Sequence, residues 1–154
     1  MIDTPQVIQT GAQLTAVIHL TVPRSERRTV VRPGIDEVIA AVKAQGIGPA
    51  GPWFTHHLKM DPATFDFEIC VPVIAPVVAV GRVKPGHWPA MKVARTVLHG
   101  GYEGLGAAWA EFDAWIKTNG YDTGPDLWEC YAAGPESSTD PANWRTELSR
   151  LLIA

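Results

Sequence analysis

The sequence predicts an α+β fold in which a strand–helix–strand–strand unit occurs twice, at about residues 7–72 and 77–154. Two observations carry this prediction. Apolar side chains recur at helical spacing in two stretches, and a strand-like segment precedes each of them. After each helix come a Gly-Pro turn and two further strand-like runs. We therefore expect one domain with an antiparallel sheet, two main helices on one face and a ligand groove between the halves.

The first half begins with a loose segment at residues 1–6, followed by a β-branched strand at 14–22. Residues 23–32 carry four Arg and one Glu, which is typical of an exposed connection. The first helix is expected over 33–46, because Pro33 suits a first helical turn. Its apolar stripe consists of Ile35, Val38, Ile39 and Val42.

A hairpin is expected next, with strands at 53–58 and 65–71. A further strand should start at Val77, break at the Pro/Gly-rich run 84–89 and resume over 91–98.

The second helix is expected over 103–119, ended by Gly120 in a left-handed cap. Its apolar face should comprise Leu105, Trp109, Phe112, Trp115 and Ile116. A strand at 127–131, a loop at 132–143 and a final strand at 145–153 complete the second hairpin.

The two halves can be aligned on their Gly-Pro pairs, Gly51-Pro52 and Gly124-Pro125. This register places Phe54 on Leu127, His56 on Glu129, Leu58 on Tyr131 and Phe67–Ile69 on Thr146–Leu148. In that case His56 and Glu129 hold equivalent positions and look into the same groove.

Bulk composition excludes several classes of function. A net charge of −3 gives no reason to expect direct nucleic-acid binding. The apolar run 69–81 is too short for a membrane span and no signal pattern opens the chain, so we expect a cytoplasmic protein. Cys70 and Cys130 lie in predicted strands, which favours free thiols, and the spacing of the His and Cys residues predicts neither a metal nor a cofactor. Because the symmetry is internal, we expect a monomer.

Glu129 is a lone acid between Trp128 and Cys130 in an apolar strand. A buried, unpaired charge is costly, so the carboxylate needs a partner. We expect that partner to be a ligand; the alternative is a structural acid bonded to a neighbouring Tyr, Arg or backbone group. Strand alternation places Leu127, Glu129 and Tyr131 on one face.

Aromatic residues are the candidate walls of the site, since six Trp is a surplus suited to flat apolar ligands. The proposed ligand-binding set is Glu129, Tyr131, Tyr102, His56, Phe54, Trp53 and Trp88. Trp109 and Trp115 are assigned to the core. If the protein is an enzyme, Glu129 and Tyr131 are the catalytic candidates.

The order and spacing of several short motifs resemble the GyrI-like small-molecule-binding family, the effector-binding domain of AraC-type and MerR-type regulators. The motifs are His99–Tyr102 with Leu105, Trp115-Ile116, Gly120-Tyr121, Glu129–Tyr131, Trp144–Leu148, Gly51–Phe54 and Phe67–Pro72. The resemblance runs from about residue 14 to the end. In place of the family's usual Gly-Pro-Tyr this chain has Gly-Gly-Tyr at 100–102, and an Arg-rich insert occupies 23–32.

The resemblance implies that Glu129 meets the cationic or polar part of bulky lipophilic ligands. Some free-standing members look like hydrolases of cyclopropane-bearing DNA alkylators, which makes an enzyme using Glu129 the alternative. A protein-interaction modulator is a third hypothesis, and it predicts an exposed apolar patch. Because no helix-turn-helix precedes residue 14, we expect a free-standing domain.

Overall fold

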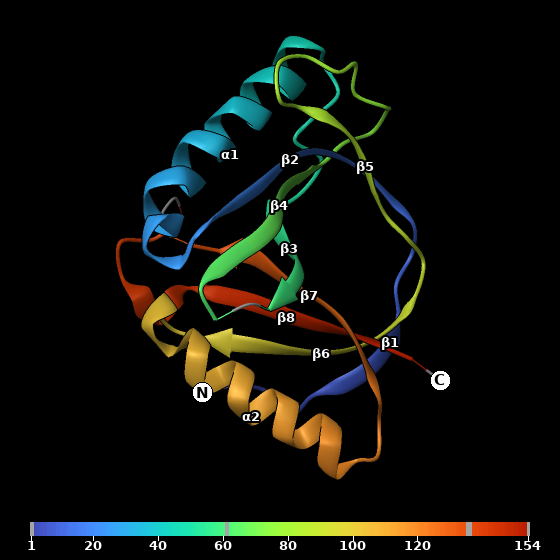
Figure 1. The fold of residues 1–154 in the computed structure, drawn as a ribbon, viewed down its shortest axis with the longest axis vertical. Coiled ribbons are helices and arrows are strands. Elements are labelled where there is room, and N and C mark those ends of the chain that lie inside the picture. The colour runs from blue at the N-terminus through green and yellow to red at the C-terminus, as the bar shows by residue number, and fades with distance from the viewer. Residues whose placement is uncertain (1, 61, 135–136, 154) are drawn as a thin grey trace. The chain divides into compact units, whose positions relative to one another are not determined.

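The computed structural model describes residues 2–60, 62–134 and 137–153. The chain forms two compact units, residues 11–90 and residues 1–10 with 91–154. Each unit is a four-stranded antiparallel sheet with one long helix (Figure 1). The predicted α+β class is therefore confirmed.

The unit of residues 11–90 contains β2 (Gln13–Pro23), β3 (Phe54–Met60), β4 (Thr64–Pro72) and β5 (Lys84–Trp88) in the order β3-β4-β2-β5. Helix α1 (Arg27–Ala44) follows a 3-10 turn, η1 (Arg24–Glu26). The helix buries Ile35 against Phe67 and Ile69 of β4, and Val38 and Val42 against the same sheet face. This is the stripe that the sequence predicts.

The unit of residues 1–10 and 91–154 contains β1 (Gln6–Gln9), β6 (Lys92–His99), β7 (Thr123–Ala133) and β8 (Arg145–Leu152) in the order β1-β6-β8-β7. Helix α2 (Leu105–Thr118) lies between the 3-10 turns η2 (Tyr102–Gly104) and η3 (Pro141–Asn143) in the chain. Phe112 and Ile116 of α2 pack with Leu98 and Leu148. Gly120 ends the helix at a φ of 78°, as predicted.

The two units have the same order of strands when each is counted from its edge strand. The edge strands β1 and β5 do not pair with the strand that follows them in the chain. Strand β1 precedes β2 but pairs with β6, and β5 precedes β6 but pairs with β2. Each unit thus contains four strands and one long helix, and its edge strand lies next to the first of the other three strands.

Helix α1 begins six residues earlier than predicted, at Arg27, so the expectation of an exposed connection over 23–32 is wrong for its second part. Pro33 lies inside the helix rather than in its first turn. The guanidinium groups of Arg24 and Arg27 lie 4.3 and 5.2 Å from the ring centroid of Phe65. These cation–π contacts hold the basic segment against β4.

Two further expectations about strands are wrong. Gln6, expected at the end of a loose segment over 1–6, begins strand β1, and residues 84–88 form β5 instead of interrupting a strand. Pro85 is tolerated because β5 lies at a sheet edge. Residues 77–79 are not in a strand, and a single bridge between Val80 and Val83 precedes β5.

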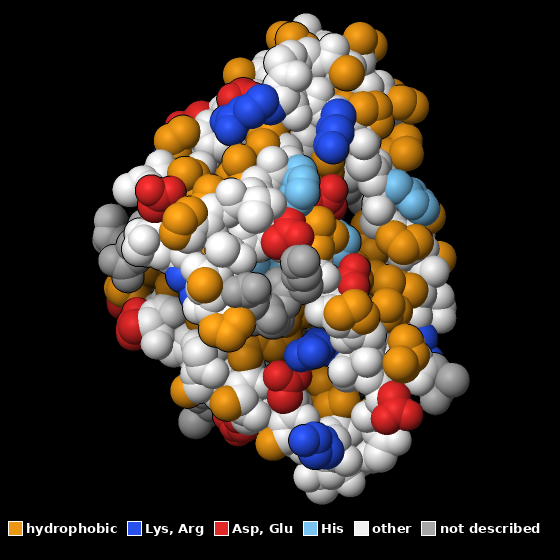
Figure 2. All heavy atoms as spheres, viewed as in Figure 1, with side chains coloured by type: hydrophobic (Ala, Val, Ile, Leu, Met, Phe, Trp, Pro, Cys, Tyr) orange, Lys and Arg blue, Asp and Glu red, His pale blue; other side chains and the backbone are white. Residues whose placement is uncertain are grey.

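Exposed hydrophobic side chains gather on the loop between β4 and β5. Ile74, Val78 and Val80 are more than half exposed, and Figure 2 shows hydrophobic side chains over this loop at the top of the view. Among the described residues, no helix has the length and apolar character needed to cross a membrane.

Candidate ligand site

The carboxylate of Glu129 is buried on β7, with 6% of the residue exposed, and donors from the protein hold both of its oxygens. The indole Nε1–H of Trp109 donates to Oε2 at 2.7 Å, and the Tyr131 hydroxyl donates to Oε1 at 2.8 Å. The expectation that Glu129 lacks a protein partner is therefore wrong, and the alternative of a bond to a neighbouring Tyr is confirmed.

Secondary structure positions each member of this network. Glu129 and Tyr131 are two residues apart on one strand, so their side chains leave the same face. Glu129 pairs across the sheet with Leu148, which belongs to the core that α2 covers, and Trp109 comes from that helix. The carboxylate is therefore enclosed between β7 and α2.

The arrangement suits an ionised carboxylate. The indole N–H is a donor only, and hydrogen bonds to a charged acceptor are stronger than those between neutral groups. A negative charge in this desolvated position interacts with a nearby cation more strongly than it would in water. The two hydrogen bonds also hold the carboxylate in one orientation.

Aromatic rings surround the network. Tyr102 meets Tyr131 edge-on, with ring centroids 5.8 Å apart, and lies 5.1 Å from the ring of Trp144. Trp109 packs on Phe112 at 5.7 Å. Tyr102, Trp109 and Trp144 are half-buried, so parts of their surfaces are open to a ligand.

Two of the predicted site residues, Tyr102 and Tyr131, thus lie together near Glu129. Trp109 and Trp144, which the sequence does not predict for the site, also contact members of this group. The sequence does contain an indication for Trp109, because the indole N–H of a buried Trp normally donates to an acceptor. Trp109 lies on an apolar helix face, and Glu129 is the lone acid of the strand that follows, so Glu129 is a candidate acceptor for the indole N–H of Trp109.

The predicted wall residues of the first half do not form one cluster in their own unit. Trp53 packs in the core on the α1 side of the sheet. Phe54 and His56 pair with Cys70 and Glu68, which alternate with the α1-facing residues of β4 and so lie on the other face. Phe54 contacts the ring of Trp88 at 4.7 Å.

The predicted equivalence of His56 and Glu129 is wrong by one residue. Ile69 and Leu148 are equivalent in the alignment, and they pair with Thr55 and Glu129. The counterpart of Glu129 is therefore Thr55. A shift of one residue moves a side chain to the opposite face of the sheet, which explains why His56 faces away from α1.

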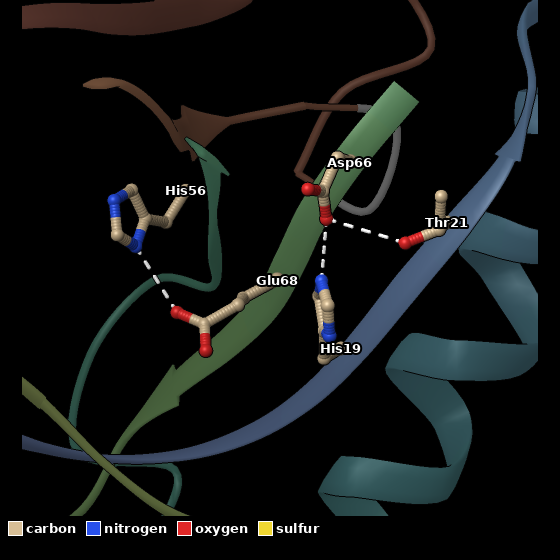
Figure 3. Close-up of polar contacts among 5 residues, drawn as sticks. All are labelled: His19, Thr21, His56, Asp66 and Glu68. Atoms are coloured by element: carbon tan, nitrogen blue, oxygen red, sulfur yellow. Dashed lines mark hydrogen bonds and ion pairs between the residues drawn. The ribbon is translucent and has the colours of Figure 1, made fainter. Parts of the chain in front are cut away.

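His56 belongs instead to a polar cluster on β2, β3 and β4 (Figure 3). Its Nδ1 lies 3.0 Å from Oε1 of Glu68, and Asp66 bonds both His19 and the hydroxyl of Thr21. In Figure 2, histidine and acidic side chains lie close together at this place. The hydrogen bond from His56 lowers the pKa of Glu68.

Two other kinds of side chain bear on chemistry, the potential metal ligands and the cysteines. Within the described part of the chain, no group of three or more His, Cys, Asp or Glu side chains is arranged to hold a metal ion. Cys70 and Cys130 are free thiols, as expected. Burial raises the pKa of Cys130 to about 12 and that of Cys70 well above its usual range, which disfavours the reactive thiolate.

The model of the GyrI-like small molecule binding domain matches residues 4–149 of this chain. The chain belongs to this family. No curated protein matches it.

Among solved structures, this GyrI-like domain is similar to the EcmrR C-terminal domain, with a TM-score of 0.85, 21% identity and 97% of each chain covered. It is also similar to EcmrR in a complex with DNA, with a TM-score of 0.84 and 21% identity. The match covers 97% of this chain and 57% of the EcmrR chain, so this chain spans little more than half the length of that protein.

Two further likenesses are to SAV2435 bound to tetraphenylphosphonium and to a hydrolase encoded by lin2189 from Listeria innocua. For SAV2435 the TM-score is 0.71 at 12% identity, covering 99% of this chain and 95% of that one. For the Listeria protein the TM-score is 0.69 at 11% identity, covering 97% and 91%. At these identities the likenesses establish the fold alone.

Proposed function

We propose that this GyrI-like domain binds bulky lipophilic small molecules, cationic or planar, with Glu129 as the acidic anchor. The observation that carries the proposal is the buried carboxylate held by Trp109 and Tyr131 among aromatic rings. Family membership supports small-molecule binding in general. The tetraphenylphosphonium bound to SAV2435 is an example of the ligand class, a cation wrapped in aromatic groups.

Physical chemistry favours such a cation over a compact one. A lipophilic cation spreads its charge and carries few tightly held waters, so entering an apolar site costs it little. A ring face under the cation contributes about 0.5–2 kcal/mol. Tyr102 and Trp109 offer such faces, while the hydrogen bonds from Trp109 and Tyr131 keep the carboxylate oriented.

Calorimetric titration with tetraphenylphosphonium tests the anchor. Glu129→Gln keeps the size of the side chain and removes its charge, and we expect roughly tenfold or greater loss of affinity. The matched control is Glu147→Gln on β8, which is paired with Cys130 and so faces away from α2. It should change affinity by less than about twofold. Equal affinity of wild type and Glu129→Gln would refute the anchor.

Phe54, His56, Trp53 and Trp88 stay proposed contacts, and the same titration tests them one at a time as Ala variants. Loss of roughly tenfold in affinity supports a contact. A folded variant with wild-type affinity removes that residue from the site.

A hydrolase acting on strained electrophiles is the second candidate, favoured by the 2.8 Å bond between Tyr131 and Glu129. In this scheme the carboxylate of Glu129 accepts a proton from water as the water oxygen bonds to the strained carbon. The carbon–carbon bond that breaks leaves its electron pair on the other carbon, which takes up that proton from Glu129. Chromatography of a cyclopropane-bearing alkylator after incubation tests it. We expect faster ring opening than in buffer and none with Glu129→Gln; an intact compound excludes the reaction.

A further inference from the structure

A cavity separate from the Glu129 network lies at the C-terminal end of α2. Its volume is about 500 Å³, a size that accommodates a small organic molecule. Its walls include Asp113, Ile116, Lys117, Tyr121, Arg150 and Ile153. Glu129, Trp109 and Tyr131 do not line it.

Arg150 occupies a position on β8 where an apolar residue is expected. Its neighbours on the same face of the strand, Leu148 and Leu152, belong to the core beneath α2. The side chain of Arg150 is only 17% exposed. A guanidinium in such a place is costly unless hydrogen bonds and opposite charge compensate it.

Within the described part of the chain, hydrogen bonds and opposite charges compensate the guanidinium of Arg150 only in part. One nitrogen, Nη1, donates to Oδ1 of Asp113 at 2.9 Å, and the Asp113 side chain is 48% exposed. The Nε atom of Arg150 is buried, and no hydrogen-bond partner for it lies in the regions that the structure describes. A guanidinium has five N–H donors, so this buried cation can take a further acceptor.

The other walls determine what kind of acceptor fits. Ile116, Ile153 and Tyr121 give the cavity an apolar side, and Tyr121 stacks on Trp115 with 20° between the ring planes. Lys117 adds a second positive charge, while Asp113 and Asp122 add two carboxylates. With charges so balanced, a ligand with one negative charge fits better than a polyanion.

We propose that this cavity binds a small monocarboxylate with an apolar body. The carboxylate accepts hydrogen bonds from the guanidinium of Arg150, and the apolar body lies against Tyr121 and Ile153. The ligand then adds an acceptor to the part of Arg150 that lines the cavity, in the planar geometry that guanidinium and carboxylate share.

NMR titration of the intact, isotope-labelled protein with benzoate tests the proposal. We expect saturable shifts of the amides of residues 113–123 and 150–153. The neutral isostere benzamide should bind roughly tenfold more weakly, because it cannot form the charged pair. Arg150→Gln should cause a similar loss of benzoate affinity.

A second variant and a control guard against a folding defect in Arg150→Gln. Ile153→Asp changes a residue that is 51% exposed and adds a negative charge to the cavity wall, so it should repel benzoate in a folded protein. Arg95→Gln is the control, because Arg95 bonds Ser149, which does not share the face of Arg150. It should leave benzoate binding unchanged.

The outcomes separate this site from the one around Glu129. Both cavity variants should bind tetraphenylphosphonium as wild type does, and Glu129→Gln should bind benzoate as wild type does. The proposal is overturned by no benzoate binding at about 10 mM. Equal binding of benzamide, equally tight binding of inorganic phosphate, or wild-type affinity in Ile153→Asp would overturn it as well.

Discussion

Of the two hydrogen bonds that Glu129 accepts, residue spacing alone predicts the one from Tyr131. Glu129 and Tyr131 are two positions apart in a strand, so the hydroxyl reaches the carboxylate by local geometry. Trp109 comes from α2, and its contact depends on how the helix packs on the sheet. Helical periodicity identifies the apolar face of α2, but it does not show which of its members also makes a polar contact.

The hydrogen bond between His56 and Glu68 predicts acid sensitivity. Because the folded-state pKa of Glu68 is lowered, the carboxylate stabilises the fold above its unfolded pKa, and this contribution is lost as pH falls through the folded value. Glu68→Gln should reduce the free energy of unfolding by about 1 kcal/mol at neutral pH.

Urea denaturation at neutral and acid pH measures this difference. The gap between wild type and Glu68→Gln should close in acid, while Glu111→Gln on the exposed surface of α2 should show no such gap. A gap that stays constant across the range would contradict the role of the ionised carboxylate.

At the scale of elements, both helices and the two hairpins were predictable from periodicity and turn residues. The start of α1 was not, because a run of Arg indicates solvent exposure, and its contacts with Phe65 are made across the fold. Strand β5 was also missed. Pro85 and Gly86 are typical of a break, and only pairing with β2, about 70 residues earlier in the chain, makes them an edge strand.

Gly86 illustrates what that pairing requires. A Cβ at this position would lie 2.5 Å from Cγ1 of Val17 and 2.7 Å from Oγ1 of Thr15. Gly86→Ala should therefore lower the free energy of unfolding by about 1–3 kcal/mol.

Gly106→Ala is the matched control, since a Cβ there meets no atom within 4 Å and the residue lies in α2. It should leave stability unchanged or raise it by up to about 1 kcal/mol. Equal denaturation midpoints for the two variants would show that the close contact of β5 with β2 does not form.

At the scale of the whole molecule, the unit of residues 91–154 depends on residues 1–10, a distant part of the chain that supplies its edge strand. Ile2 and Val7 pack against the core beneath α2, far in sequence from the rest of that unit. The duplicated topology was predictable, but the pairing of β1 with β6 was not, because strand pairing between distant segments leaves little trace in local patterns.

Removing residues 1–10 tests this dependence. The loss of β1 and of two apolar contacts should lower the free energy of unfolding by roughly 2–4 kcal/mol. Hydrogen exchange should speed up in β6, whose residues 92–95 pair with β1. A variant with the exposed Gln6 and Gln9 changed to Ala should behave like wild type. Unchanged protection of β6 in the truncated chain would show that β1 is not needed.

The central claim is that Glu129 selects for positive charge, and a comparison of two ligands in two proteins tests it most directly. Calorimetry would measure tetraphenylphosphonium and the neutral triphenylphosphine oxide against wild type and Glu129→Gln. We predict that wild type prefers the cation by roughly tenfold or more and that Glu129→Gln has no such preference. A preference of the same size in both proteins would contradict the account.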